Sequence, residues 1–182
     1  MKIISLGLGI QSTAMYIMST LGDIDRADYA IFADPGAELP DTYMLWEDLN
    51  KWSKDNNGIP LIKKTKSLYK DIIEGLNSYG ARWASIPAFS EKGGMIRRQC
   101  TGEYKVDVVM KEIRKLQNLR KYQKMSPTEV WLGISLDEIQ RMKLSRVHRV
   151  TYKYPLIDRK ITRSECKDYL EKNGFLNVKK SS

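Results

Sequence analysis

Glycines and hydroxyl side chains crowd into one short segment near the start of the chain, directly after an apolar run that begins at Ile3. Apolar positions from Ala14 to Leu21 then recur with helical spacing, so we expect a strand, a tight turn and a helix. Glycines accept positive φ and let the backbone approach a ligand closely, and the first amides of a helix are unpaired donors. The turn therefore predicts phosphate binding, with an ordinary serine-capped turn as the alternative. The residues concerned are Ser5, Gly7, Gly9, Ser12 and Thr13.

Four basic residues could neutralise phosphate or sulfate: Arg97, Arg98, Lys105 and Arg141. The arginine fork suits such oxyanions because it donates two parallel hydrogen bonds. A solvated basic surface is the alternative for the whole set. Cys100 follows two of these arginines and precedes a predicted helix. Both surroundings lower the pKa of a thiol, so we expect a reactive or ligand-binding cysteine there.

Carboxylates at three positions could also serve a nucleotide site. Asp34 ends a predicted strand, where it could orient loop amides or contact a ribose or a metal; the alternative is an Asx turn before Pro35 and Gly36. Asp137 and Glu138 could bind Mg²⁺, and the alternative is that this pair caps a helix. No general base is evident, so catalysis would rest on positioning and charge stabilisation.

Composition limits the class of protein. The chain has 182 residues, with 31 basic against 22 acidic side chains and a net charge of +9. This charge fits either a nucleic-acid partner or a pocket for a small charged nucleotide with solvated surface lysines. Two cysteines and one histidine make neither a disulfide framework nor a His-based metal site. With no membrane-spanning run and no signal-peptide pattern, we expect a cytoplasmic protein with no membrane partner.

Strand and helix patterns alternate along the chain, which is typical of βαβ units and a mostly parallel sheet. Strands are predicted at 28–33, 61–62 and 128–134, with an edge element at 151–156. Helices are predicted from a cap at Asp41 or Thr42, from Ser67, from Thr101 and from Thr162, the last with Glu165 completing a capping box. The stretch from Asn77 to Gln99 reads as a long irregular loop. Cys166, Tyr169 and Leu170 should face the core, and Asn173-Gly174 should end the last helix.

Ligands of open parallel sheets bind beyond the carboxyl ends of the strands. Five separated stretches are predicted to converge there: residues 5–13, 34–42, 97–105, 133–141 and 155–163. Together they resemble the phosphoadenosine phosphosulfate (PAPS) reductase-like branch of the PP-loop, or adenine nucleotide alpha-hydrolase-like, superfamily. The resemblance lies in Ser5-Leu6-Gly7-Leu8-Gly9-Ile10-Gln11-Ser12-Thr13, Asp34-Pro35-Gly36-Ala37-Glu38-Leu39-Pro40-Asp41-Thr42-Tyr43, Arg97-Arg98-Gln99-Cys100-Thr101 with Tyr104-Lys105, Gly133-Ile134-Ser135-Leu136-Asp137-Glu138 with Arg141, and Tyr154-Pro155-Leu156-Ile157-Asp158 before Thr162.

This resemblance implies a single α/β domain over residues 1–176, Rossmann-like, with a five-stranded, mostly parallel sheet flanked by helices, and a polar tail at 177–182. It implies ATP or PAPS as the ligand, with nucleotide contacts extended to Gln11, Asp34, Gly133 and Arg141. Cys100, Arg98 and Lys105 become the candidate catalytic residues, and Mg²⁺ the candidate ion at Asp137 and Glu138. Relatives with ATP adenylate a substrate and release pyrophosphate, often before sulfur insertion, whereas the reductases pass electrons from a cysteine to the sulfate of PAPS.

The chain departs from the family pattern in two places. Gln11 stands where many ATP-using members have Asp, and the Cys-x-x-Cys pair that follows in related chains is not in this sequence. With two cysteines, an iron–sulfur cluster held by this chain is not expected. Two other functions remain open: a non-catalytic nucleotide-binding subunit, with a protein partner or a second copy, and a nucleic-acid sulfur-modification protein.

Overall fold

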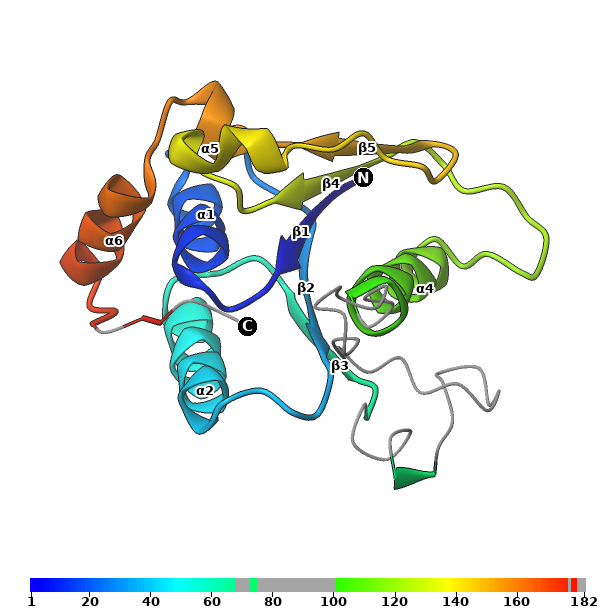
Figure 1. Cartoon of the computed structure of the whole chain (residues 1–182), viewed down its shortest axis with the longest axis horizontal. Coiled ribbons are helices and arrows are strands. Elements are labelled where there is room, and N and C mark those ends of the chain that lie inside the picture. Colours follow the sequence, from blue (N-terminus) through cyan, green and yellow to red (C-terminus); the bar gives the residue numbers. More distant parts are fainter. Residues whose placement is uncertain (68–72, 75–100, 177, 180–182) are drawn as a thin grey trace, which may run out of the picture. The chain divides into compact units, whose positions relative to one another are not determined.

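A computed structural model describes residues 1–67, 73–74, 101–176 and 178–179 of the chain. It confirms the predicted fold class, α/β with a five-stranded, all-parallel sheet flanked by helices, in the strand order β3-β2-β1-β4-β5 (Figure 1). The registers of three neighbouring pairs place Ile4 beside Ala30 and Trp131, and Val130 beside Tyr152. The strands are β1 (Lys2–Leu6), β2 (Tyr29–Asp34), β3 (Leu61–Thr65), β4 (Thr128–Leu132) and β5 (Val150–Lys153).

The chain divides into two compact units, which are described separately. The first unit takes in Met1–Phe32, Leu39–Ile62 and Leu119–Ser182, and the second takes in Ala33–Glu38 and Lys63–Asn118. The helices of the first unit are α1 (Ile10–Leu21), α2 (Pro40–Asp55), the 3₁₀ helix η2 (Leu136–Arg141), α5 (Pro155–Asp158) and α6 (Arg163–Lys172). The second unit contains the π-helical turn η1 (Thr101–Val106) and α4 (Asp107–Leu116).

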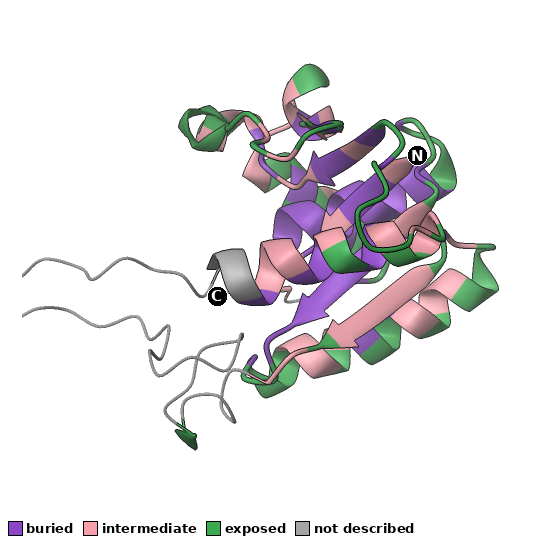
Figure 2. Cartoon of the chain, turned by 90° about the vertical axis from the view of Figure 1, so that its right-hand side faces the viewer, coloured by how far each residue is buried: buried purple, intermediate pink, exposed green. Residues whose placement is uncertain are grey.

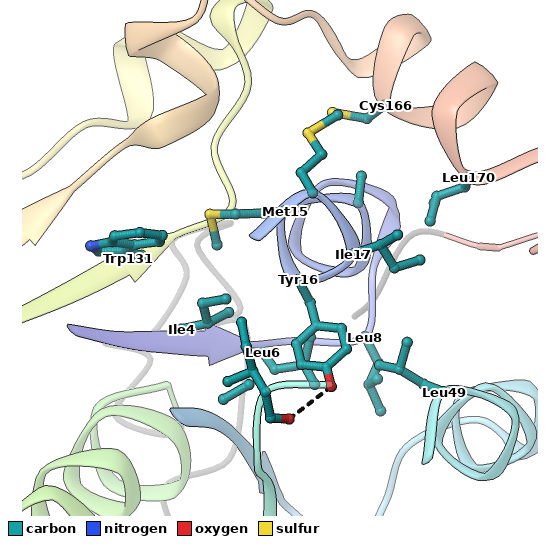
Figure 3. Packing of buried hydrophobic residues seen from close by; sticks show 14 of the residues in the cluster. Ile4, Leu6, Leu8, Met15, Tyr16, Ile17, Leu49, Trp131, Cys166 and Leu170 are labelled. Atoms are coloured by element: carbon teal, nitrogen blue, oxygen red, sulfur yellow. Dashed lines mark hydrogen bonds between the residues drawn. The ribbon is translucent and has the colours of Figure 1, made fainter. Parts of the chain in front are cut away.

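The core of the first unit forms around α1. Every residue of this helix from Ile10 to Thr20 is buried, including the polar residues Gln11, Ser12, Thr13, Ser19 and Thr20. Figure 3 shows Met15 on the side of Trp131 of β4, and Ile17 on the side of Leu170 of α6. Burial is densest in β1, β2 and β4, whereas β3, an edge of the sheet, is intermediate along most of its length (Figure 2). Near-continuous apolar strands are what a sheet covered on both faces requires.

Several predicted elements are confirmed. Thr162 caps α6 as predicted, because its hydroxyl accepts from Glu165 N–H while the Glu165 carboxylate accepts from Thr162 N–H. Gly174, with φ of +84°, follows the end of that helix. Cys166 and Leu170 are buried and Tyr169 packs against them, also as predicted.

Other details of the prediction are wrong. Asp41 and Thr42 do not cap α2, because the helix begins at Pro40, whose fixed φ suits the first helical position. Leu21 was placed on the buried stripe of α1, but the helix ends there and its side chain is 48% exposed. The strand at 128–134 ends two residues earlier, and Pro155 begins α5 instead of extending β5. The predicted helix after Ser67 and the irregular stretch 77–99 lie outside the described residues, apart from Ile73 and Glu74.

Candidate phosphate-binding site

The loop after β1 leaves the sheet at the point where the strand order reverses. β1 continues to β2 on one side, β4 continues to β5 on the other, and β1 and β4 are direct neighbours with Ser5 beside Leu132. Ligands of open α/β sheets bind in the crevice at such a point. The loop from Gly7 to Gly9 therefore stands where the fold offers a binding site, next to the segment that follows β4.

Ser12 holds this loop together. Its hydroxyl lies 3.2 Å from both Gly7 N and Gly9 N, accepting from each, and 3.3 Å from Gly9 O, to which it can donate. Gly9 is the N-cap of α1, so the amides that follow it open the helix at the positive end of its dipole. Ser12 was predicted as a direct phosphate contact; in this structure its hydroxyl serves the loop's own backbone.

Leu8 carries the positive φ of the loop, at +53°, whereas Gly9 has a φ of −100°. The expectation that the glycines supply the positive φ is therefore wrong here. The Leu8 side chain is 2% exposed and belongs to the hydrophobic core cluster. We infer that this burial offsets the cost of a left-handed leucine, since an L-residue with a β-carbon is disfavoured there by about 1–2 kcal/mol.

Two other predicted residues of the loop are buried. Gln11 is 9% exposed and its Nε2 lies 3.4 Å from the hydroxyl of Ser135, which links the loops that follow β1 and β4. Thr13 is fully buried, and its hydroxyl has no hydrogen-bond partner among the residues that the structure describes. Buried polar atoms without a partner are rare and call for an explanation. Ser5 is half-buried, one residue before the end of β1.

Gly133 allows these two loops to meet. A Cβ atom added to it would stand 2.7 Å from both Cα and N of Ser12, which are backbone atoms that cannot turn aside. The residue was predicted as a nucleotide contact, and the structure gives it a packing role at the amino end of α1. Gly133 could be singled out from the sequence because it directly follows a strand.

The acidic pair on η2 lies on the same side of the first unit but its carboxylates are engaged. Asp137 Oδ1 accepts from Arg163 N at 2.9 Å and so caps α6. A hydrogen bond from the Ser135 hydroxyl, followed by the one from the Arg163 amide, lowers the pKa of Asp137. Glu138 forms an ion pair with Arg141. Within the described ranges no three acidic, histidine or cysteine side chains gather as a metal site would need, and the Mg²⁺ site stays a prediction.

A second region, in the second unit, holds the other predicted carboxylate. Asp34 is 2% exposed, and its Oδ1 accepts from Gly36 N at 2.8 Å, which is the Asx turn that the sequence left open. Its Oδ2 accepts from the Thr65 hydroxyl at 3.1 Å and lies 3.3 Å from Lys63 Nζ. Gly36 has a φ of +71°, so the turn favours glycine there.

Two further buried carboxylates in this unit also face lysines. Glu38 lies 3.2 Å from Lys105, one of the predicted catalytic residues, and Glu112 lies 3.3 Å from Lys64. We use the name carboxylate–lysine cluster for these three separate ion pairs of the second unit, Asp34 with Lys63, Glu38 with Lys105 and Glu112 with Lys64. Sequence reasoning missed both glutamates. Glu112 could have been noticed, because it interrupts the apolar stripe of α4 next to Ile113.

The structure describes only one of the two cysteines. Cys166 is fully buried, and burial, with smaller contributions from Asp137 and Glu165, raises the pKa of its thiol to about 12. It is the inert buried cysteine that the sequence predicted. Cys100, Arg97 and Arg98 lie outside the described residues, so their predicted roles remain predictions.

Of the five stretches predicted to converge, the structure brings three together in the first unit. Ser12 meets Gly133, Leu136 N–H donates to Ile161 O, and Asp137 accepts from Arg163 N. Residues 34–38 and Lys105 meet in the second unit. None of the helices in the described ranges has the length and apolar character needed to cross a membrane. Comparison with models of known protein families finds none that matches the chain, and comparison with curated proteins finds no match either.

Proposed function

We propose that the chain binds the phosphate groups of an adenine nucleotide, ATP or PAPS, on the loop after β1. The observation that carries this proposal is the position of the loop, which leaves β1 at the switch point of the sheet and leads into the amides that open α1. A phosphate oxygen is a strong acceptor for a hydroxyl and for the amides that open a helix. The resemblance of residues 5–13 to a pyrophosphate loop supports the same ligand.

The chemistry that we propose is adenylyl or sulfur transfer by a PAPS reductase-like enzyme. The amides of Ile10 and Gln11 open α1, and donors of this kind stabilise charge that develops on phosphate oxygens. With ATP, attack at the α-phosphate would release pyrophosphate. With PAPS, a thiol such as Cys100 would attack sulfur, forming a thiosulfonate and releasing the bisphosphate.

Calorimetric titration with Mg-ATP and, separately, with adenosine 3′,5′-bisphosphate tests the proposal. Preference for the bisphosphate would assign a PAPS-type site, and preference for ATP would assign an adenylating enzyme. In the Gly7→Val variant we expect binding to be abolished while the fold remains, because the side chain would fill space that the phosphate needs. Binding without any pyrophosphate release or reduction would favour the non-catalytic subunit.

Gly22→Ala is the matched control for this variant. Gly22 ends α1 at a φ of +89°, with open space around the position of an added Cβ. We expect that control to lose stability through backbone strain and to keep nucleotide affinity. Unchanged affinity in Gly7→Val would remove the assignment of the phosphate loop.

A nucleic-acid-modifying function is the second candidate, and one surface favours it. The segment from the last residue of η2 to β5 carries five exposed basic or titratable side chains: Arg141, Lys143, Arg146, His148 and Arg149. The hydroxyl of Tyr154 fixes the connection by bonding both N–H and C=O of Lys143. Duplex DNA binding that falls steeply with salt would support this function, and its absence at low salt would remove it.

A further inference from the structure

A groove runs along α2 and is bordered by residues of the segment that follows α6. Its volume is about 940 Å³. Trp52 and Leu45 of α2 line it from one side, and Phe175 and Val178 from the other, with Leu8 contributing from the loop after β1. This volume is large enough for a small-molecule ligand or for one face of a bound peptide.

Three aspartates form a straight acidic stripe along this groove. Asp41, Asp48 and Asp55 all line it and are seven residues apart on α2. Because each residue turns a helix by about 100°, positions seven apart return to within about 20° of the same direction, spaced by about 10.5 Å. The stripe therefore runs for about 21 Å, nearly the length of the helix.

The charges of this stripe are largely unmatched. Asp41 forms an ion pair with Lys179 of the chain's own C-terminal segment. Asp48 and Asp55 are exposed, and neither has an ion pair within the described residues. Among the described residues that line the groove, three are aspartates and two, Lys51 and Lys179, are lysines. This acidic excess in a chain of net charge +9 favours a cationic partner.

Apolar side chains stand beside the stripe. Leu39 is 59% exposed, Met44 is 66% exposed and Leu176 is 70% exposed, and all three line the groove. Exposed apolar side chains gathered around one groove are typical of a protein-binding site. A ligand that carried only positive charge would leave them in water, so the partner must combine cations with an apolar face.

We propose that this groove binds a basic amphipathic helix of a partner protein. Lysines or arginines at seven-residue spacing on that helix would face Asp48 and Asp55, as Lys179 faces Asp41, and its apolar face would cover Met44 and Leu176. A second copy of the chain fits less well. A two-fold contact places the same patch against itself, which would set the aspartate stripes against each other between two chains of charge +9.

The test uses a fluorescently labelled synthetic helix of leucine and lysine, with lysines at seven-residue spacing over about 14 residues. Its binding to the full chain is measured by anisotropy at 0.15 M salt, where the screening length of about 8 Å leaves only local charges effective. We expect saturable binding, weakened at least tenfold in the double variant Asp48→Lys with Asp55→Lys. Both sites are exposed, and thermal unfolding checks that the variant stays folded.

Glu47→Lys is the matched control, because Glu47 is exposed on the same helix but does not line the groove. It changes the net charge of the chain by the same amount per site and should keep full affinity. A peptide with glutamate in place of lysine should not bind at the groove. The proposal is overturned if the lysine peptide does not bind, if the double variant binds it equally well, or if Glu47→Lys weakens it as much. It is also overturned if the chain sediments as a dimer that Met44→Asp dissociates, since the occupant would then be a second copy.

Discussion

The loop after β1, where we propose phosphate binding, and the carboxylate–lysine cluster show two different ways to manage charge. In the loop, the hydrogen-bonding groups are uncharged: the amides of Gly7 and Gly9, the hydroxyl of Ser12 and the buried hydroxyl of Thr13. In the cluster, buried carboxylates pair with partly exposed lysines, such as Glu38 with Lys105 and Glu112 with Lys64. Under the proposed function the loop would receive a negative charge from outside, whereas the cluster holds negative charges that it already has.

The two regions also differ in how the chain assembles them. The loop contacts join residues three to five positions apart, so they form with the first turn of α1. The cluster joins residues far apart in sequence; Lys105 and Glu38 are separated by 67 positions. Removing the lysine of such a pair leaves a buried carboxylate without its partner, which costs more than losing an exposed pair. We therefore expect the cluster to matter chiefly for stability and the loop chiefly for binding.

The largest effect should come where the loop is packed most closely. Gly133→Val places a branched side chain against the backbone of Ser12, since even a Cβ would lie 2.7 Å from its Cα and N. We expect the free energy of unfolding to fall by about 3 kcal/mol or more, as in overpacked cores, when measured by urea denaturation. We also expect lost nucleotide affinity, because the amino end of α1 must shift.

If Gly133→Val keeps its free energy of unfolding, the close packing of the two loops is not important for stability. Gly22→Ala again provides the control, because an added Cβ meets no atom within 4 Å there and only its φ of +89° is unfavourable. That variant should lose about 1 kcal/mol. A Gly133→Val loss no greater than this would mean that the two loops move apart at little cost.

The second largest effect should come from the cluster. Asp34→Ala removes the acceptor of Gly36 N–H and of the Thr65 hydroxyl, together with the partner of Lys63. We expect a loss of about 2 kcal/mol in the free energy of unfolding, because two hydrogen bonds to a buried, charged acceptor are lost together with an ion pair. Nucleotide affinity, measured by calorimetry on the folded variant, distinguishes an Asx turn from a direct ligand contact. If Asp34 only holds the turn, the affinity should change by less than threefold.

Asp25→Ala is the matched control for that substitution. Asp25 also pairs with a lysine, Lys2, at 2.8 Å, but its side chain is 73% exposed. Exposed pairs contribute little, so the control should leave the stability nearly unchanged. Equal losses in the two variants would contradict the distinction between buried and exposed pairs, and a more than tenfold loss of affinity in Asp34→Ala would make it a ligand contact.

Much of the fold could be predicted because its signals are local. The capping box of Thr162 and Glu165, the glycine turn before α1 and the strand runs each occupy a few consecutive residues. The positive φ at Leu8 could not be predicted, since it depends on a buried pocket built by distant elements. The pairing of Lys105 with Glu38 could not be predicted for the same reason. In the sequence both are ordinary charged residues far apart, and only the fold brings them together.

The smallest effect should come from Asp137, and it separates a helix cap from a metal ligand. Asp137→Asn keeps an oxygen that can accept from Arg163 N, so we expect a loss of about 0.5 kcal/mol or less at pH 7. The pKa of Asp137 is lower in the folded chain than its usual 3.8, so the carboxylate's contribution is present above about pH 4 and lost as pH falls through the lowered pKa.

The difference in urea midpoint between Asp137→Asn and the original chain should therefore disappear near pH 2. The dependence of nucleotide affinity on Mg²⁺ should be the same in both chains, because the Asp137 carboxylate is committed to α6. A variant that keeps its stability but loses the effect of Mg²⁺ would show that Asp137 is a metal ligand. In that case the loop region would, like the carboxylate–lysine cluster, use a full charge of its own, and the contrast between the two regions would no longer hold.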